Sequence, residues 1–265
     1  MILSVGRCQQ VSGHSSSVNL ASASENCLQK YIPTSTDRSV DVKELTKRAL
    51  SALTEGEVKA IQVPENCCLG VSVEWIVSFL ESSDCIFSCQ KARSLHKEYW
   101  SNIKASDRLD TLNNKKKDCV ELTYQFLSSK MHDKEINIDV EPYSFNHVKS
   151  LVSTLSQAFF LLPKCCVLLI LQGQGRKTAF QGHNFIISWS VQDHNKFMTL
   201  FDPSGTQITW KRNKGETPSK FFIRVMDNIS DIIGLFIKGD GYSFEEIKSI
   251  LLYKGKSLKY ITGVD

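Results

Sequence analysis

The stretch 183-HNFIISWSVQDHNKFMTLFD-202 decides the fold, because it contains two β-rich runs around four turn-forming residues, QDHN. Such a pattern predicts an antiparallel hairpin, here with strands at 183–191 and 196–202. The outer ends of a hairpin return to the same edge of a sheet. We therefore expect His183 and Asp202 to lie next to each other.

Together these two side chains have the chemistry of one half of a catalytic site. A carboxylate beside a histidine can accept a hydrogen bond from Nδ1–H, which fixes the tautomer of the ring. Taken separately, His183 is a strand-edge histidine, and Asp202 begins 202-DPSG-205, a run that favours a turn. The pair gains a functional interpretation only with a third residue from elsewhere in the chain.

The segment 62-QVPENCCLGVSVEW-75 supplies a candidate for that residue, Cys68. An irregular stretch ends there and a helix is expected to begin, since Leu69, Val73 and Ile76 recur at helical spacing. The unpaired backbone N–H groups of a helix N-terminus favour a thiolate. A lone cysteine at such a place is more often a small buried hydrophobic residue, so its position alone does not establish a nucleophile.

A fourth residue, Gln62, completes a possible catalytic set. Its side-chain amide can act as an oxyanion donor beside the thiol, together with the backbone N–H of Cys68. His183 would then serve as the base and Asp202 as the group that orients it. Cys67 is adjacent to Cys68, which leaves the choice between the two thiols open.

The remaining periodicity predicts helices before the hairpin and after it. A continuous apolar run at 165–171 predicts a buried strand. Helices are expected at 41–56, from Cys68 onward, over 86–131 with an interruption at 113-NNKKKD-118, and at 144–163, 217–230 and 243–252, the last with a Ser243–Glu246 capping box. Helices followed by strands and then helices predict one α+β domain.

The domain is expected to span residues 41–265, after a Ser- and Asn-rich leader at 1–40. Such a leader is typical of a disordered terminus and also of a secretion signal. The chain has 265 residues, which is enough for one large domain with a substantial core. No internal repeat divides it.

Composition argues against a nucleic-acid-binding, membrane-spanning or disulfide-rich protein. The net charge of +4 is too small to indicate nucleic-acid binding, and no apolar run approaches the roughly 18 residues of a membrane span. The nine cysteines are odd in number and no signal peptide precedes them, which favours reduced thiols in a cytosol-like compartment. His96, His132 and His147 lack partners at metal-ligand spacing, so neither a metal nor an organic cofactor is expected.

Three motifs resemble the YopT/AvrPphB-type papain-like cysteine proteases, effectors that bacteria inject into host cells by type III secretion. The segment 66-NCCLGVSVEWIV-77 is similar to the family's nucleophile segment, with Ser72 and Trp75 at the matching distances from Cys68. The segments 181-QGHNFIISW-189 and 200-LFDPSGT-206 are similar to the blocks around the family's histidine and aspartate. The motifs together span about half of the chain.

The resemblance implies a papain-like fold in which a helical part carrying the nucleophile packs on an antiparallel sheet carrying His and Asp. It implies Cys68 as nucleophile, His183 as base and then acid, and Asp202 as orienter, in a protease that cuts a host protein in the host cytosol. The chain shows no myristoylation signal and no self-processing site that would expose an acylatable cysteine, so membrane association is left open. A monomer is expected.

Two other functions fit the same residues. A glutamine deamidase or transglutaminase uses the same triad on a side-chain amide, and an inactive adaptor would use the groove only for binding a host protein. Substrate specificity is expected in the loops 172–180 and 204–215, whose basic residues favour an acidic partner. Trp189 and Trp210 are expected in the core rather than in a substrate groove.

Overall fold

The computed structural model describes residues 55–82, 87–105, 118–139, 151–174, 181–192, 195–240 and 243–254. The expected leader at 1–40 lies outside these residues, as does nearly all of the helix expected at 41–56. The domain boundary at residue 41 therefore stays a prediction.

Seven strands form one antiparallel sheet in the described part of the chain, in the order β1-β6-β5-β4-β3-β7-β2. Their bounds are β1 (Glu57–Ala60), β2 (Ile136–Asp139), β3 (Lys164–Gln174), β4 (Gln181–Gln192), β5 (Asn195–Asp202), β6 (Thr206–Lys211) and β7 (Ser243–Lys254). The expected hairpin is confirmed, because β4 pairs with β5 and Gln192 lies opposite Asn195 at its closed end.

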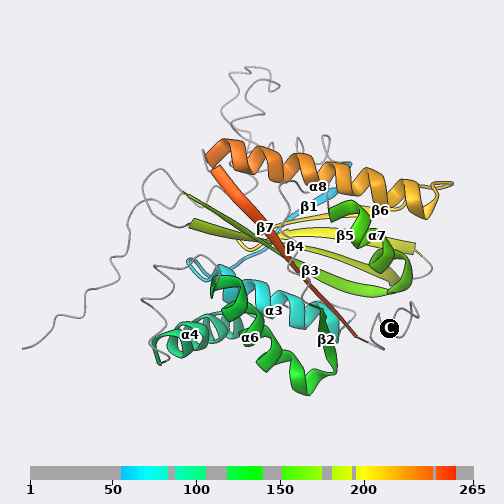
Figure 1. Ribbon diagram of the computed structural model, residues 1–265. Helices are drawn as coiled ribbons and strands as arrows, with labels where there is room; N and C mark the ends of the chain where they lie inside the picture. Colours follow the sequence, from blue (N-terminus) through cyan, green and yellow to red (C-terminus); the bar gives the residue numbers. More distant parts are fainter. Residues whose placement is uncertain are drawn as a thin grey trace, which may run out of the picture.

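Helices lie on both sides of this sheet (Figure 1). On one side are α3 (Cys68–Glu81), α4 (Cys89–Ala105) and α6 (Asp118–Met131), with a short 3₁₀ turn, η1 (His132–Lys134), after α6. On the other side are α7 (Leu151–Leu161) and α8 (Pro218–Asp240). The α+β class predicted from the sequence is confirmed.

Alternation along β4 explains why the sheet is covered on both faces. Phe185, Ile187 and Trp189 belong to the core under α7 and α8, whereas Ile186 belongs to the core under α3. Successive side chains of a strand point to opposite faces, so an uninterrupted apolar run needs cover on both. The same reasoning applies to β3, where Cys165 and Cys166 are both fully buried, one in each core.

The helix expected at 243–252 is wrong, because these residues lie in β7, a strand between β3 and β2. The capping box at Ser243 is a local signal, and tertiary pairing overrides it. Ile250 and Leu252 are buried under α3, while Tyr253 is buried in the opposite core. A strand can bury alternate residues in two separate cores, whereas a helix with one apolar stripe cannot.

Further differences concern short strands and a helix length. The sequence patterns did not predict β1, β2 or β6, and β6 occupies part of the stretch expected to be a specificity loop at 204–215. Trp210 of β6 and Trp189 are 0% and 1% exposed, which confirms that both are core residues. Helix α8 begins at its proline as expected, but it continues ten residues beyond 230.

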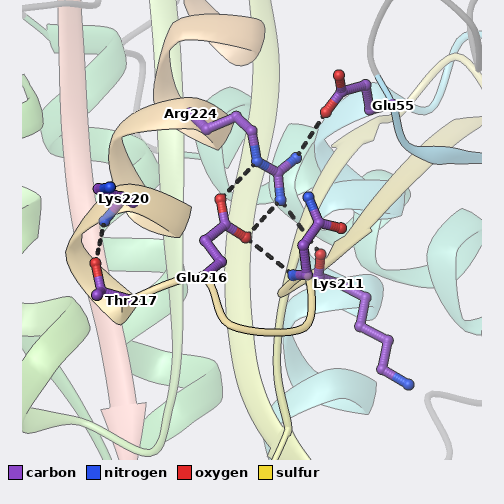
Figure 2. Close-up of polar contacts among 7 residues, drawn as sticks. Glu55, Lys211, Glu216, Thr217, Lys220 and Arg224 are labelled. Atoms are coloured by element: carbon purple, nitrogen blue, oxygen red, sulfur yellow. Dashed lines mark hydrogen bonds and ion pairs between the residues drawn. The ribbon is translucent and has the colours of Figure 1, made fainter.

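Arg224 of α8 joins three segments through polar contacts (Figure 2). Its Nε donates to Glu216 Oε1 at 2.8 Å, and its Nη1 pairs with Glu55 Oε2 at 3.4 Å. Its Nη2 donates to the carbonyl oxygen of Lys211 at 3.4 Å. The hydrogen bond to Glu216 raises the pKa of Arg224 and lowers that of Glu216. These contacts link α8 to the end of β6 and to Glu55, near the start of β1, the strand that leads toward Cys68.

Candidate active site

Cys68 is the first residue of α3, and Cys67 is its N-cap. The helix start expected at Cys68 is therefore confirmed. The first helical hydrogen bond runs from Val71 N to Cys67 O at 2.8 Å. The Cys68 thiol accepts a hydrogen bond from its own backbone N–H, which favours the thiolate. The sulfur therefore lies at the positive end of the helix dipole.

Trp75 fixes α3 on the sheet next to Asp202. Its ring stacks on Phe201 of β5, with centroids 5.1 Å apart, and on Phe79 of α3 at the same distance. Residues i and i+7 share one face of a helix, so Cys68 faces the sheet on the same side as Trp75. Because Asp202 follows Phe201 directly, this packing brings the start of α3 toward the aspartate.

His183 and Asp202 are hydrogen-bonded, as the hairpin pattern predicts. His183 Nε2 lies 3.0 Å from Asp202 Oδ1, and the two side chains are 14% and 0% exposed. The expectation that Nδ1–H faces the carboxylate is wrong, because the contact is made by Nε2. The pairing of β4 with β5 begins at Ile186 and Phe201, and the histidine ring packs edge-on against Phe185, so the backbone and this contact set the orientation of the ring.

Ser204 holds the other side of the carboxylate. Its backbone N–H donates to Asp202 Oδ1 at 2.9 Å, and its hydroxyl donates to Oδ2 at 2.5 Å. Burial raises the pKa of Asp202, but the charge of His183 and the hydrogen bonds from His183 and Ser204 outweigh burial. The net result is a pKa below the ordinary value of the group. Asp202 is therefore an ionised, buried carboxylate.

The pKa of the Cys68 thiol is shifted upward, opposite to the shift of Asp202. Burial and the negative charge of Asp202 raise the pKa of Cys68 to about 11. Asp202 and the Cys68 thiol therefore lie within electrostatic reach of each other. A thiol with this pKa is protonated near neutral pH, so it needs a proton acceptor before it can act as a nucleophile. His183, hydrogen-bonded to the same carboxylate, is the candidate acceptor.

The turn after β5 is connected to the segment before Cys68. The N–H of Ile61 donates to the carbonyl oxygen of Gly205 at 2.8 Å, and Gly205 has φ of 111°. A Cβ at this glycine would lie 2.6 Å from the carbonyl oxygen of Ile61. Glycine is required here both by the positive φ and by this close approach. The hairpin that carries His183 and the segment that leads to Cys68 are thereby joined.

Gln62 lies in the expected segment, but its oxyanion role stays a prediction. The residue is exposed, and its carbonyl oxygen accepts a hydrogen bond from the Cys89 thiol at 3.3 Å. Within the residues that the structure describes, no hydrogen bond of the Gln62 side chain to Cys68 is present. Cys67, the alternative thiol, is half-buried, and burial raises its pKa.

Sequence reasoning missed Ser204 and Phe201 as parts of this site. Ser204 had a signal, because a residue two positions after an aspartate in a turn commonly bonds to its carboxylate. Phe201 had none, because the stacking of a strand residue on a helix residue depends on how the layers pack. Ser72, expected from its motif, is fully buried on α3, and its hydroxyl has no hydrogen-bond partner among the described residues.

The described part of the chain contains neither a candidate membrane-spanning helix nor a candidate metal-binding group. No helix there is long and apolar enough to cross a membrane. Among the same residues, no three His, Cys, Asp or Glu side chains are grouped so that they could hold a metal ion.

Comparison with known proteins gives a structural likeness. The chain is similar to the crystal structure of the Pseudomonas avirulence protein AvrPphB, with a TM-score of 0.44 and 16% sequence identity. The likeness covers 71% of this chain and 91% of that one. No protein-family model matches the sequence, and no curated protein matches it.

Proposed function

We propose that this protein is a cysteine protease in which Cys68 attacks a peptide carbonyl, His183 transfers protons and Asp202 orients the histidine. One observation carries the proposal. The buried carboxylate of Asp202 is hydrogen-bonded to His183 and also acts electrostatically on Cys68, which begins a helix. A thiol, an imidazole and an orienting carboxylate are the parts that nucleophilic thiol catalysis needs.

The first step moves a proton from sulfur to nitrogen. With Nε2–H donating to Asp202, the Nδ1 atom of His183 carries the lone pair and accepts the proton of the Cys68 thiol. The resulting imidazolium is stabilised by the ionised Asp202, and the thiolate by the N-terminus of α3. The sulfur then bonds to the substrate carbonyl carbon, and the carbonyl oxygen becomes an oxyanion.

The second half of the reaction returns the proton. The His183 imidazolium donates it to the leaving amine as the peptide C–N bond breaks, which leaves a thioester on Cys68. Water, deprotonated by His183, then cleaves the thioester and restores the thiol. The backbone N–H of Cys68 and the side-chain amide of Gln62 are the proposed oxyanion donors. Gln62 is exposed and lies in the segment that leads to Cys68.

We further propose a host protein as the substrate, cut in the host cytosol after secretion of the enzyme. The support is the resemblance of three separate motifs, around Cys68, His183 and Asp202, to those of type III effector proteases. This part of the proposal concerns location and substrate rather than chemistry, and it is tested separately.

The test maps new protein N-termini in host-cell lysate after exposure to the wild-type chain and to Cys68→Ala and His183→Ala. We expect new N-termini with the wild type and none with either variant. Circular dichroism of each variant checks that the fold is retained. If Cys68→Ala produces the same fragments, the assignment of the nucleophile is wrong.

The same samples separate the rival chemistries. A deamidase or transglutaminase would change glutamine side chains, and peptide masses, without creating new N-termini. An inactive adaptor would produce neither change, and His183→Ala would not slow the alkylation of its Cys68 by iodoacetamide near neutral pH.

A further inference from the structure

The first turns of α4 lie against the nucleophile segment. The Cys89 thiol donates to Gln62 O at 3.3 Å. A Cβ at Gly70 would lie 2.1 Å from the Ala92 carbonyl oxygen and 2.8 Å from His96 N, so α4 passes very close to the start of α3. Three residues of α4, namely 89, 92 and 96, therefore contact the segment 62–70 that surrounds Cys68.

Arg93 lies on this same face of α4. Residues at i, i+3, i+4 and i+7 share one face of a helix, and Cys89, Ala92, Arg93 and His96 have this spacing. Its charge acts on the neighbouring thiol: burial raises the pKa of Cys67, and Arg93 opposes that shift. Helix geometry thus puts Arg93 on the face of α4 that contacts the segment 62–70, and its charge acts on Cys67, the N-cap of α3.

The guanidinium has no partner of its own in the described part of the chain. Arg93 is exposed, and no hydrogen bond or ion pair joins it to a described carboxylate. Arg224 shows the contrast, because its guanidinium is held by Glu216 and Glu55. Glu65 is also exposed near the nucleophile, but among the described contacts it makes no ion pair with Arg93. An exposed, unpaired arginine beside Cys67, the chain neighbour of Cys68, can bind an anion.

We propose that Arg93 binds a carboxylate of the substrate, so that the enzyme prefers an Asp or Glu side chain close to the scissile bond. This inference rests on the proposed protease function for its substrate class, but not for the anion site itself. A planar guanidinium can form two parallel hydrogen bonds with a carboxylate and so fix its position as well as attract it. Arg93 would thereby determine which peptide bond lies over Cys68.

The anion site can be tested without any catalysis. Cys68→Ala removes the proposed nucleophile, and Cys67 then reports the local potential through its alkylation rates with iodoacetate and with iodoacetamide. The two reagents differ in charge, so the ratio of their rates isolates attraction of the anion from any change in thiol pKa. Peptide mapping by mass spectrometry assigns the label to Cys67.

We expect Arg93→Gln, in the Cys68→Ala background, to lower this ratio about two- to fivefold at low ionic strength. The difference should disappear in molar salt. Lys220→Gln is the matched control, because it removes an exposed cation from α8, on the opposite side of the sheet (Figure 1). An unchanged ratio in Arg93→Gln, or an equal decrease in Lys220→Gln, would overturn the anion site.

The substrate class is read from the new N-termini in host-cell lysate. We expect Asp or Glu to be enriched within a few residues of the cuts made by the wild type, and this enrichment to be lost with Arg93→Gln. Cuts without acidic enrichment would refute the substrate preference. If the wild type makes no cuts, the protease proposal fails, while the Cys67 ratios still decide whether Arg93 attracts anions.

Discussion

Trp75 of α3 stacks on Phe201 of β5, with ring centroids 5.1 Å apart and ring planes 10° from parallel. Phe201 is the residue before Asp202, and Trp75 lies on the same helix face as Cys68. One buried contact therefore sets the separation between the start of the nucleophile helix and the carboxylate that orients His183. The site is assembled by packing between layers as well as by the hairpin.

Replacing Trp75 should therefore affect stability and the site together. Trp75 is 3% exposed, and we expect Trp75→Ala to lower the free energy of unfolding by about 3–5 kcal/mol. Trp100→Ala is the matched control, because Trp100 is 41% exposed and should cost less than about 1 kcal/mol. Urea denaturation measures both. Equal losses would show that Trp75 does not bear on the packing of α3.

Gly205 and Gly215 both have positive φ, but only Gly205 lies against the Ile61 carbonyl oxygen. Comparing alanine substitutions at the two positions therefore separates the cost of that clash from the cost of backbone strain. Gly215 has φ of 80°, and a Cβ there would meet no described atom within 4 Å beyond its chain neighbours. Gly215→Ala should therefore cost only the strain, about 1–2 kcal/mol. Gly205→Ala adds a clash with the Ile61 carbonyl oxygen and should cost about 1–3 kcal/mol more. Thermal unfolding compares the two variants.

Amide hydrogen exchange gives a local check on the same pair. The Ile61 N–H donates to Gly205 O, so Gly205→Ala should speed exchange at Ile61, while Gly215→Ala should leave it unchanged. If both substitutions cost the same and Ile61 stays protected, the turn does not hold the nucleophile segment.

Ser204→Ala tests how the buried carboxylate is held. The pKa of Asp202 is depressed in the folded chain, so the stabilisation from its ionised form is present above about pH 4 and is lost as the pH falls through the folded pKa. Removing the Ser204 hydroxyl removes a hydrogen bond to the charge. We expect a loss of about 1.5–3 kcal/mol near neutral pH.

The pH dependence of the stability loss in Ser204→Ala distinguishes a lost hydrogen bond to the charged Asp202 from a general packing effect. The difference in unfolding free energy between wild type and Ser204→Ala should shrink as the pH falls through the depressed folded pKa of Asp202, because the carboxyl then becomes protonated in both. Urea denaturation at a series of pH values from neutral downward measures the difference. A gap that is constant with pH would mean that Ser204 stabilises the turn without acting on the charge of Asp202.

Local patterns were sufficient to predict the parts of the site that lie on regular elements. The β4–β5 hairpin follows from alternation and turn residues, and the start of α3 at Cys68 follows from helical spacing. These signals depend on neighbours in the sequence, which a single chain displays. The contact between His183 and Asp202 follows directly from the hairpin.

Features that depend on tertiary packing could not be predicted in this way. Residues 243–254 carry a helix-start signal, yet they form β7 because β3 needs a second partner and two cores need apolar side chains. The choice of His183 Nε2 over Nδ1 depends on ring orientation within the folded sheet. The position of Arg93 beside Cys67 depends on the close passage of α4 at Gly70.

The coupling of His183 to Cys68 is the central claim, and alkylation of Cys68 by iodoacetamide as a function of pH tests it most directly. Burial and Asp202 raise the pKa of the Cys68 thiol to about 11, so reaction near neutral pH requires His183 to accept the proton. We predict that at pH 7 the wild type is alkylated at Cys68 at least about tenfold faster than His183→Ala. The rate in the variant should rise only toward pH 11. Equal rates in the two chains across this range would contradict the account.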